Sequence, residues 1–231
     1  MKATVEVTDL GNALKSVSPH MGDPKDELPF LVRTRLEFGT ENVTLSATNR
    51  YTIGRAIVSD WEPTGEIGIL DLMPEQIAQI MAVFKPAKKD SDEPDQHITI
   101  EADGSEITVT DVSGLFPGTT LKLPRAATDE TFPNIDVMLR AVMDKNLDDR
   151  DGAERLVVNF SMINLFGHAV RAYKHPLVLD VATEVSAVLV TVGESFIGAL
   201  MPIRPGDEQT AEYAEWHRAW DRRLPVPTPR P

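Results

Sequence analysis

The chain has 231 residues, no cysteine and a formal charge of −13 at pH 7. The lack of cysteine excludes disulfides, thiolate metal sites and cysteine nucleophiles. No stretch approaches the roughly 20 apolar residues of a membrane helix, and the N-terminus lacks the apolar run of a secretory signal, so we expect a cytoplasmic protein with no membrane partner. Taken alone, the acidic charge argues against nucleic-acid binding, because phosphate-binding surfaces are usually basic.

The first part of the chain predicts one strand, one helix and three further strands. Residues 2–7 alternate apolar and polar side chains, as in a half-buried strand. A helix follows, with Thr8 as the expected N-cap and Pro19 at its end. The three strands are expected at residues 30–38, 43–48 and 52–58, with a turn at Asn49–Arg50 between the last two.

The same order of elements is predicted twice more. In the second unit Asp71 is the expected helix cap and Pro74 lies early in the helix; in the third unit Ser161 is the expected cap. The strands of these units are expected at residues 65–70, 98–102, 106–110, 119–123, 156–160, 177–182, 187–192 and 199–203. Three β-α-β-β-β units predict an α+β fold whose helices lie on one face of antiparallel sheets.

These units divide the chain into four segments. Residues 1–126 hold the first two units, and residues 127–155 form a connector with a short helix at 137–144. Residues 156–206 hold the third unit. Residues 207–231 are expected to form a polar helix, with Trp216 and Trp220 at helical spacing, and a proline-rich tail.

No catalytic or metal-binding motif is present in the sequence. Its five histidines are scattered, and no nucleophile elbow or phosphate-binding glycine loop occurs. We therefore expect no enzymatic activity, catalytic residue, cofactor or metal. The alternative, an α+β enzyme whose carboxylates are brought together only by the fold, stays open at this point.

Three stretches resemble the bacterial sliding clamp family, the β subunit of the replicative DNA polymerase. Residues 28–56, which include LSATNRYTIGRA, are similar to the family's strand, turn and Leu-x-x-Ala-Thr-Asp segment. Residues 129–139, DETFPNIDVML, resemble the Phe-Pro segment that joins neighbouring clamp domains. Residues 158–205 resemble the closing half-domain, including its terminal Met-Pro-x-Arg. The resemblance covers about residues 1–205 and suggests a short or truncated clamp-like member with the repeated fold of DNA clamps.

This resemblance implies a processivity factor that encircles double-stranded DNA and tethers a DNA polymerase. A ring retains DNA by topology, so a few basic side chains on the helices are enough for weak phosphate contacts. An acidic outer sheet discourages DNA from binding outside the hole. The residues implied to face DNA are Lys15, Lys25, Lys85, His168, Arg171 and Lys174.

The resemblance also implies an apolar pocket that docks peptides of the polymerase and of the clamp loader. Methionine and aliphatic side chains suit such a groove because they adapt to varied anchors. The implied pocket residues are Leu31, Thr48, Tyr51, Ile53, Pro133, Met138, Ala199, Met201, Pro202, Ile203 and Arg204. One departure is that Asn49–Ile53 stands where the family has Asp-Gly-His/Tyr-Arg-Leu, so the glycine is lost.

Three units per chain differ from the six units of the usual clamp, and twelve units close the family's ring. Four copies would therefore form a homo-oligomeric ring, or three copies if residues 134–155 hold a decayed fourth unit. The second function hypothesis is a clamp-like adaptor or decoy that keeps the peptide pocket and encircles nothing.

Overall fold

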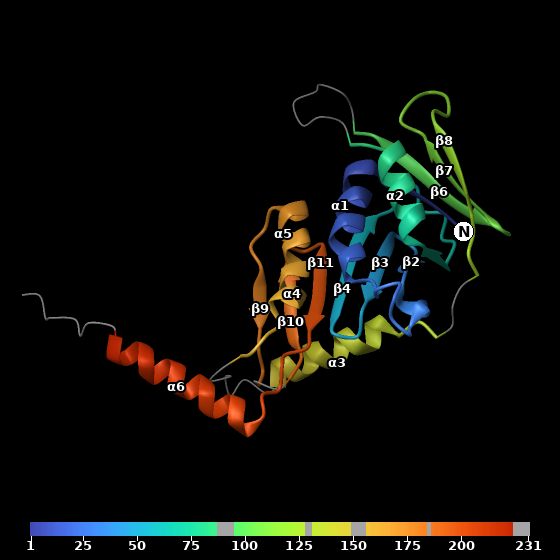
Figure 1. Ribbon diagram of the computed structural model, residues 1–231. Helices are drawn as coiled ribbons and strands as arrows, with labels where there is room; N and C mark the ends of the chain where they lie inside the picture. Colours follow the sequence, from blue (N-terminus) through green and yellow to red (C-terminus); the bar gives the residue numbers. More distant parts are fainter. Residues whose placement is uncertain (87–94, 128–130, 149–155, 184–185, 224–231) are drawn as a thin grey trace, which may run out of the picture.

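The computed structural model describes residues 1–86, 95–127, 131–148, 156–183 and 186–223. Within these ranges the chain folds into two antiparallel sheets with helices packed against them (Figure 1). The strands are β1 (Lys2–Glu6), β2 (Thr34–Phe38), β3 (Asn42–Thr48), β4 (Thr52–Ser59), β5 (Gly68–Leu72), β6 (His97–Asp103), β7 (Glu106–Asp111), β8 (Thr120–Pro124), β9 (Val178–Asp180), β10 (Val188–Val192) and β11 (Phe196–Leu200). The helices are α1 (Val7–Val17), α2 (Pro74–Val83), α3 (Ile135–Asp148), α4 (Phe160–Ile163), α5 (Gly167–Tyr173) and α6 (Asp207–Arg223), with 3-10 turns η1 (Ser18–His20), η2 (Pro29–Leu31) and η3 (Asn164–Phe166).

The first and second units exchange their first strands. Strand β1 leaves its own unit and pairs antiparallel with β6, whereas β5 pairs antiparallel with β2. The result is a four-stranded sheet in the order β1-β6-β7-β8, and a larger sheet that begins β5-β2-β3-β4. Each sheet therefore contains strands of both units, so neither unit forms its sheet alone.

The third unit continues the larger sheet. Strand β11 pairs antiparallel with β4, with Gly198 opposite Gly54 and Ala199 opposite Ile53, and the seven-stranded sheet ends with β10 and β9. We call this pairing the β4–β11 junction. It explains how the third unit can be stable without a partner unit of its own, since its last strand, β11, pairs with β4, the last strand of the first unit.

The strand expected at residues 156–160 does not form. Residues 156–159 lie outside any regular element, with Val157 accepting a hydrogen bond from the Ile203 N–H (2.8 Å), and α4 begins at Phe160. In the other two units the first strand pairs only with strands of the partner unit. Residues 135–148 form the single helix α3, so the described part of the chain holds no fourth unit with which the third could exchange a strand.

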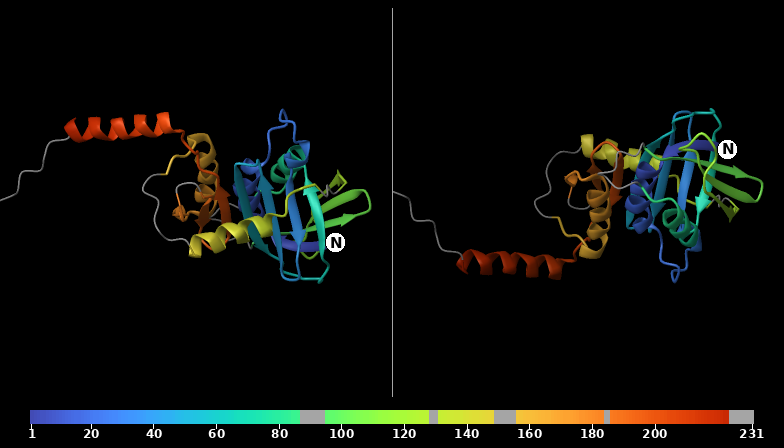
Figure 2. Two further views of the ribbon diagram at one scale, coloured as in Figure 1. Left: turned by 90° about the horizontal axis from the view of Figure 1, so that it is seen from below. Right: turned by 90° about the horizontal axis from the view of Figure 1, so that it is seen from above.

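The helices of the repeat units cover one face of the seven-stranded sheet at the β4–β11 junction. Helices α1 and α5 pack side by side there (Figure 1), and the main apolar core lies beneath them. Helix α3, which belongs to no unit, packs on the opposite face (Figure 2) through a small apolar cluster of Ile53, Phe132, Ile135, Leu139 and Ala199. The predicted α+β fold is confirmed, and α3 is an addition on the face opposite α1 and α5.

Four further local predictions are wrong. The α1 helix begins directly at Val7, so Thr8 is not its N-cap. Asp71 lies inside β5, where it is buried and ion-paired with Arg35 (Nε–Oδ1 2.8 Å) and Arg33 (Nη1–Oδ2 3.2 Å).

The other two concern the third unit. Its first helix is capped by Asn159, whose side chain accepts a hydrogen bond from the Ser161 N–H. Strand β11 covers residues 196–200 where 199–203 was expected. Separately, no helix in the described ranges combines the length and the apolar character needed to cross a membrane.

Candidate functional site

The turn between β3 and β4 forms one wall of the candidate site. The side chain of Asn49 accepts hydrogen bonds from the backbone N–H groups of Thr52 (2.8 Å) and Tyr51 (3.1 Å). The Thr48 hydroxyl donates to the Thr52 carbonyl oxygen (2.8 Å). These bonds hold Arg50 at a φ of 78°, the left-handed region that favours glycine. The turn is therefore rigid, and it presents the Tyr51 and Arg50 side chains outward.

Strand β11 and the residues after it form the second wall. Ala199 lies opposite Ile53 in the sheet, and the Met201 N–H donates to the Tyr51 carbonyl oxygen (2.8 Å). The small Ala199 side chain leaves space above the sheet that a larger residue would fill. Met201 is 46% exposed, so its flexible thioether lies at the rim of that space.

Helix α3 forms the third wall. Its inner residues Ile135 and Leu139 are buried against Ile53, and Phe132 anchors the segment before the helix under the Arg35 guanidinium (4.4 Å to the ring centroid). An ion pair between Arg55 Nη1 and Asp136 Oδ1 (2.9 Å) also ties the first turn of α3 to β4. The helix is thereby held at a fixed distance from the β4–β11 junction.

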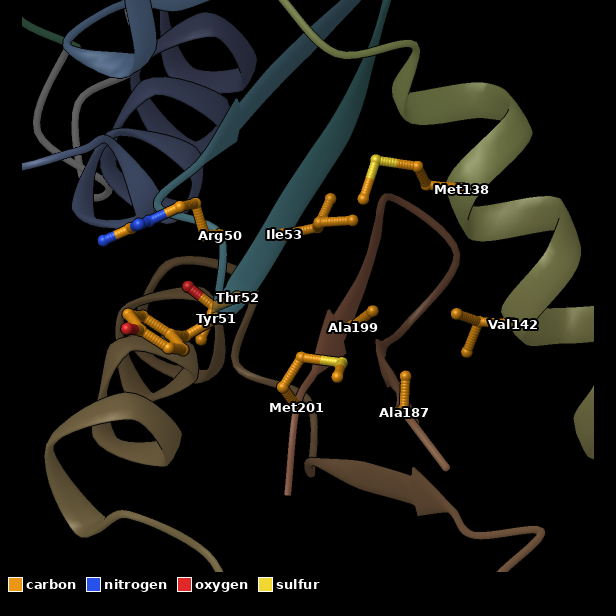
Figure 3. A pocket seen from close by; sticks show the side chains of 9 residues that line it. All are labelled: Arg50, Tyr51, Thr52, Ile53, Met138, Val142, Ala187, Ala199 and Met201. Atoms are coloured by element: carbon orange, nitrogen blue, oxygen red, sulfur yellow. The ribbon is translucent and has the colours of Figure 1, made fainter. Parts of the chain in front are cut away.

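These three walls enclose an apolar cavity of about 220 Å³, which we call the junction pocket (Figure 3). Its volume lies below the roughly 300–1,000 Å³ of typical small-molecule sites, so it suits one or two apolar side chains better than a cofactor. The pocket is lined by Arg50, Tyr51, Thr52, Ile53, Met138, Val142, Ala187, Ala199 and Met201.

Solved sliding clamps share this architecture. The chain matches a sliding clamp of Pseudomonas aeruginosa with a TM-score of 0.64 at 12% identity, over 89% of this chain and 67% of that one. It matches a putative DNA polymerase III β subunit of Eubacterium rectale with a TM-score of 0.65 at 8% identity, over 89% and 66%. The β subunit of Thermotoga maritima gives 0.62 at 12% identity, over 90% and 66%.

The fold is that of a bacterial sliding clamp. The chain spans about two thirds of the length of the clamps it matches. No protein-family model matches its sequence, and neither does any curated protein. The structural likeness establishes the fold. Sequence identities of 8% to 12% do not establish a shared activity.

The structure brings together five of the eleven residues expected in the pocket: Tyr51, Ile53, Met138, Ala199 and Met201. The other six lie outside its lining. Leu31 and Thr48 are buried in the domain, and Pro133 is half-buried before α3. Pro202 is half-buried, and Ile203 and Arg204 are exposed beyond the end of β11.

Four lining residues were not predicted: Arg50, Thr52, Val142 and Ala187. Val142 could have been found, since it lies four residues after Met138 and so on the same face of a helix. The predicted helix at 137–144 already contained it. Ala187 carries no such signal, because only the pairing of β10 with β11 brings it near the pocket.

The basic residues expected to face DNA are all exposed in this clamp fold. Lys15 lies in the last turn of α1, and His168 and Arg171 lie on the neighbouring α5, which Lys174 ends. These four therefore share the layer of helices on one face of the sheet. The other two predicted residues are Lys25, in the loop before η2, and Lys85, just after α2.

Electrostatics on this helix layer are mixed. Burial, and then the positive charge of Arg171, lowers the pKa of His168 from its ordinary value, so its imidazole is uncharged at neutral pH. Burial raises the pKa values of Glu6 and Asp9 at the start of α1, and repulsion from Asp95 raises both further. The positive charge on this face is therefore carried by lysine and arginine near the α5 end of the layer.

Directly behind the junction pocket, on the helix side of the sheet, His20 is fully buried. Its Nδ1 lies 2.9 Å from the Thr52 hydroxyl, and its ring lies 4.6 Å from that of Phe166. Burial, and to a smaller extent the charge of His168, lowers the pKa of His20 to about 3. His20 is therefore a neutral packing residue of the β4–β11 junction, set against Gly54, where even a Cβ atom would clash with its ring.

Proposed function

We propose that the protein is a clamp-like processivity factor that tethers a DNA polymerase to its template and docks partner peptides in the junction pocket. The observation that carries this proposal is an apolar pocket built where the third unit joins the first within the seven-stranded sheet, between β4, β11 and α3. A DNA-tethering role places the protein in the cytoplasm.

The chemistry of the pocket favours a peptide as its ligand. Met138 and Met201 are 41% and 46% exposed, and flexible thioethers adapt to anchors of different shape. Tyr51 provides a rigid aromatic surface with a polar end, of the kind that is common at binding hot spots. The guanidinium of Arg50 lies 5.5 Å from the Tyr51 ring and can hold a polar group of the peptide.

The helix layer supports weak, non-specific contact with duplex DNA. Lys15 and Arg171 are exposed on neighbouring helices, where they can reach phosphates without reading bases. A net charge of −13 disfavours tight binding to an open DNA surface. A homo-oligomeric ring that retains DNA by topology is compatible with both the weak phosphate contacts and the acidic net charge. Since α3 occupies the place of a fourth unit, three units per chain favour a ring of four copies.

A second candidate is a clamp-like adaptor that uses the pocket and encircles nothing. Its support is the edge of the larger sheet at β9, which has only three residues, Val178–Asp180, all exposed. A short edge offers few backbone groups for pairing with another copy.

Peptide docking is tested with a peptide that carries a glutamine followed by an aliphatic-aromatic anchor. We expect Met201→Ala to weaken its binding about 5- to 10-fold, since truncating a contacting methionine removes on the order of 1 kcal/mol of apolar contact. Fluorescence anisotropy of the labelled peptide measures the affinity. Met143→Ala is the matched control. Met143 lies on α3 and, like Met201, is partly exposed, but it does not line the pocket. Equal affinities for the Met201 variant and wild type would remove the pocket from the proposal.

Topological tethering is tested on circular DNA. Retention on nicked circles with release after linearisation is expected for a ring, and Lys15→Glu with Arg171→Glu should reduce loading. A protein that binds the peptide but passes over nicked circles without retention is the adaptor of the second candidate.

A further inference from the structure

Helix α6 extends away from the two sheets as an isolated rod (Figures 1 and 2). It follows Gly206, and it exposes two tryptophans, Trp216 at 55% and Trp220 at 59%. Exposed tryptophans are unusual on a surface that has no partner, because each aromatic side chain offers roughly 150–250 Å² of apolar area for burial. An isolated helix of this length is also only marginally stable in water.

The aromatic side chains of α6 lie on one face. Tyr213, Trp216 and Trp220 follow the spacing i, i+3, i+7, which places them along one stripe of a helix. The Tyr213 and Trp216 rings are 5.1 Å apart, and the Arg223 guanidinium lies 5.4 Å from the Trp220 ring. The spacing is that of the apolar seam in paired helices.

The charges of α6 are separated along its length. Residues 207–215 contain four acidic residues and no basic one, whereas residues 216–223 contain three arginines and one aspartate. A second α6 running in the opposite direction would place each acidic half beside a basic half. A parallel copy would place acidic beside acidic, which is unfavourable. The helix dipoles also favour the antiparallel arrangement.

We infer that α6 is a self-association helix that pairs antiparallel with α6 of a second copy of this chain. Trp216 packs beside the same residue of the second copy near the two-fold axis, and Tyr213 packs beside the second copy's Trp220. Glu212 borders the aromatic stripe and comes within reach of the second copy's Arg223, whereas Glu215, Arg218 and Arg222 lie on the opposite side of the helix, where they pair with one another. With one aromatic stripe buried on each side, the pair is a weak dimer in the micromolar range.

The test uses the full chain and two charge variants, with mass measured by analytical ultracentrifugation over a range of concentrations. The acidic-half variant carries Glu212→Lys, and the basic-half variant carries Arg223→Glu. Each variant alone is expected to self-associate at least 10-fold more weakly than wild type. An equimolar mixture of the two is expected to recover association as a heterodimer.

The mixture separates contacts between copies from contacts within one helix. Glu215 pairs with Arg218 and Arg222 of its own helix at 3.4 and 3.1 Å, and both variants keep these bridges. The basic-half variant loses only the contact of Arg223 with the Trp220 ring of its own helix. Mixing cannot restore a contact within one helix, so recovery reports pairing between copies. Circular dichroism of each variant shows whether the helix persists.

Three results would overturn the inference. The first is a monomeric mass at every concentration, and the second is association that is unchanged in both variants, as ring contacts between sheet edges would give. The third is stronger association of the acidic-half variant, which would indicate parallel pairing. Peptide binding at the junction pocket is independent of all three, so the proposed function stands or falls separately.

Discussion

The two faces of the β4–β11 junction differ in packing, although their residues alternate along the same two strands. On the helix face Gly54 and Gly198 lie opposite each other, and His20, Phe166 and Phe196 fill the space above them to within contact distance. On the α3 face the space above the strands is only partly filled, and the junction pocket is what is left open.

This difference separates stability from binding within one strand pair. A residue that faces the helices fixes how the third unit joins the first, and its neighbour that faces α3 leaves room for a ligand. Period-two alternation of side chains makes this possible, because adjacent residues point to opposite faces of a sheet. Substitutions on the helix face should therefore change folding, and substitutions on the α3 face should mainly change binding.

The largest effect is expected for Gly198→Ala. A Cβ atom at this position would meet the Ile53 carbonyl oxygen and would lie 2.7 Å from Cε1 of Phe166, so backbone and core must both shift. We expect the free energy of unfolding to fall by about 3 kcal/mol, the upper range for overpacking a core. Urea denaturation followed by circular dichroism measures it.

Gly11→Ala is the control for this prediction. A Cβ at Gly11 has no atom within 4 Å, and Gly11 lies in α1, where alanine is favoured over glycine by roughly 0.5–1 kcal/mol. The control should be slightly stabilised. A similar loss of stability in the two variants would show that the helix face of the β4–β11 junction is not more tightly packed than the α3 face.

The next effect is a dependence of stability on pH that arises from His20. Its pKa of about 3 in the folded protein lies below the ordinary value of 6.5. Below pH 6.5 the unfolded chain therefore binds a proton that the folded chain does not, so this contribution to stability is complete above pH 6.5 and is lost as the pH falls towards 3. By pH 5 the loss is about 2 kcal/mol at 1.36 kcal/mol per pH unit.

The measurement is the free energy of unfolding between pH 7 and pH 5 for wild type and His20→Leu. The variant lacks the titrating group, so its stability should fall less over this interval, whatever its stability at pH 7. Parallel curves for the two proteins would show that His20 does not titrate as a buried imidazole.

The smallest effect is expected at the rim of the α3 face, for Arg50→Gly. A left-handed conformation costs a non-glycine residue roughly 1–2 kcal/mol, and glycine loses roughly 0.5–1 kcal/mol in backbone entropy, so a gain of about 0.5 kcal/mol in stability is expected. Thermal unfolding is the measurement, and Arg50→Ala is the control, since it removes the guanidinium and keeps the strained Cβ. A gain of equal size in both variants would attribute the effect to charge.

The repeat units and most of their strands could be predicted from sequence because period-two and helical patterns are local. The Asn49–Arg50 turn was also predictable, since Asn49 can bond the backbone ahead of it. The resemblance to the clamp family, and not a local pattern, predicted five of the residues that line the junction pocket.

What could not be predicted depends on partners distant in the sequence. Asp71 has the composition of a helix cap, and only the return of β2 beside β5 places Arg33 and Arg35 next to it. Residues 156–160 have the apolar pattern of a strand, but among the residues that the structure describes there is no further unit to pair with them. The pattern of residues 196–203 is almost continuously apolar, so the register of β11 was set by its pairing with β4 and not by alternation.

Strand exchange delays strand pairing while the chain is being synthesised. Lys2 pairs with Glu101, so β1 leaves the ribosome and waits for β6 for roughly 5–20 s at a synthesis rate of about 5–20 residues per second. Strand β4 waits longer still, because its outer edge stays unpaired until β11 has been made. The junction pocket is thus among the last features to assemble, and a peptide that docks there can bind only chains whose synthesis has passed Met201.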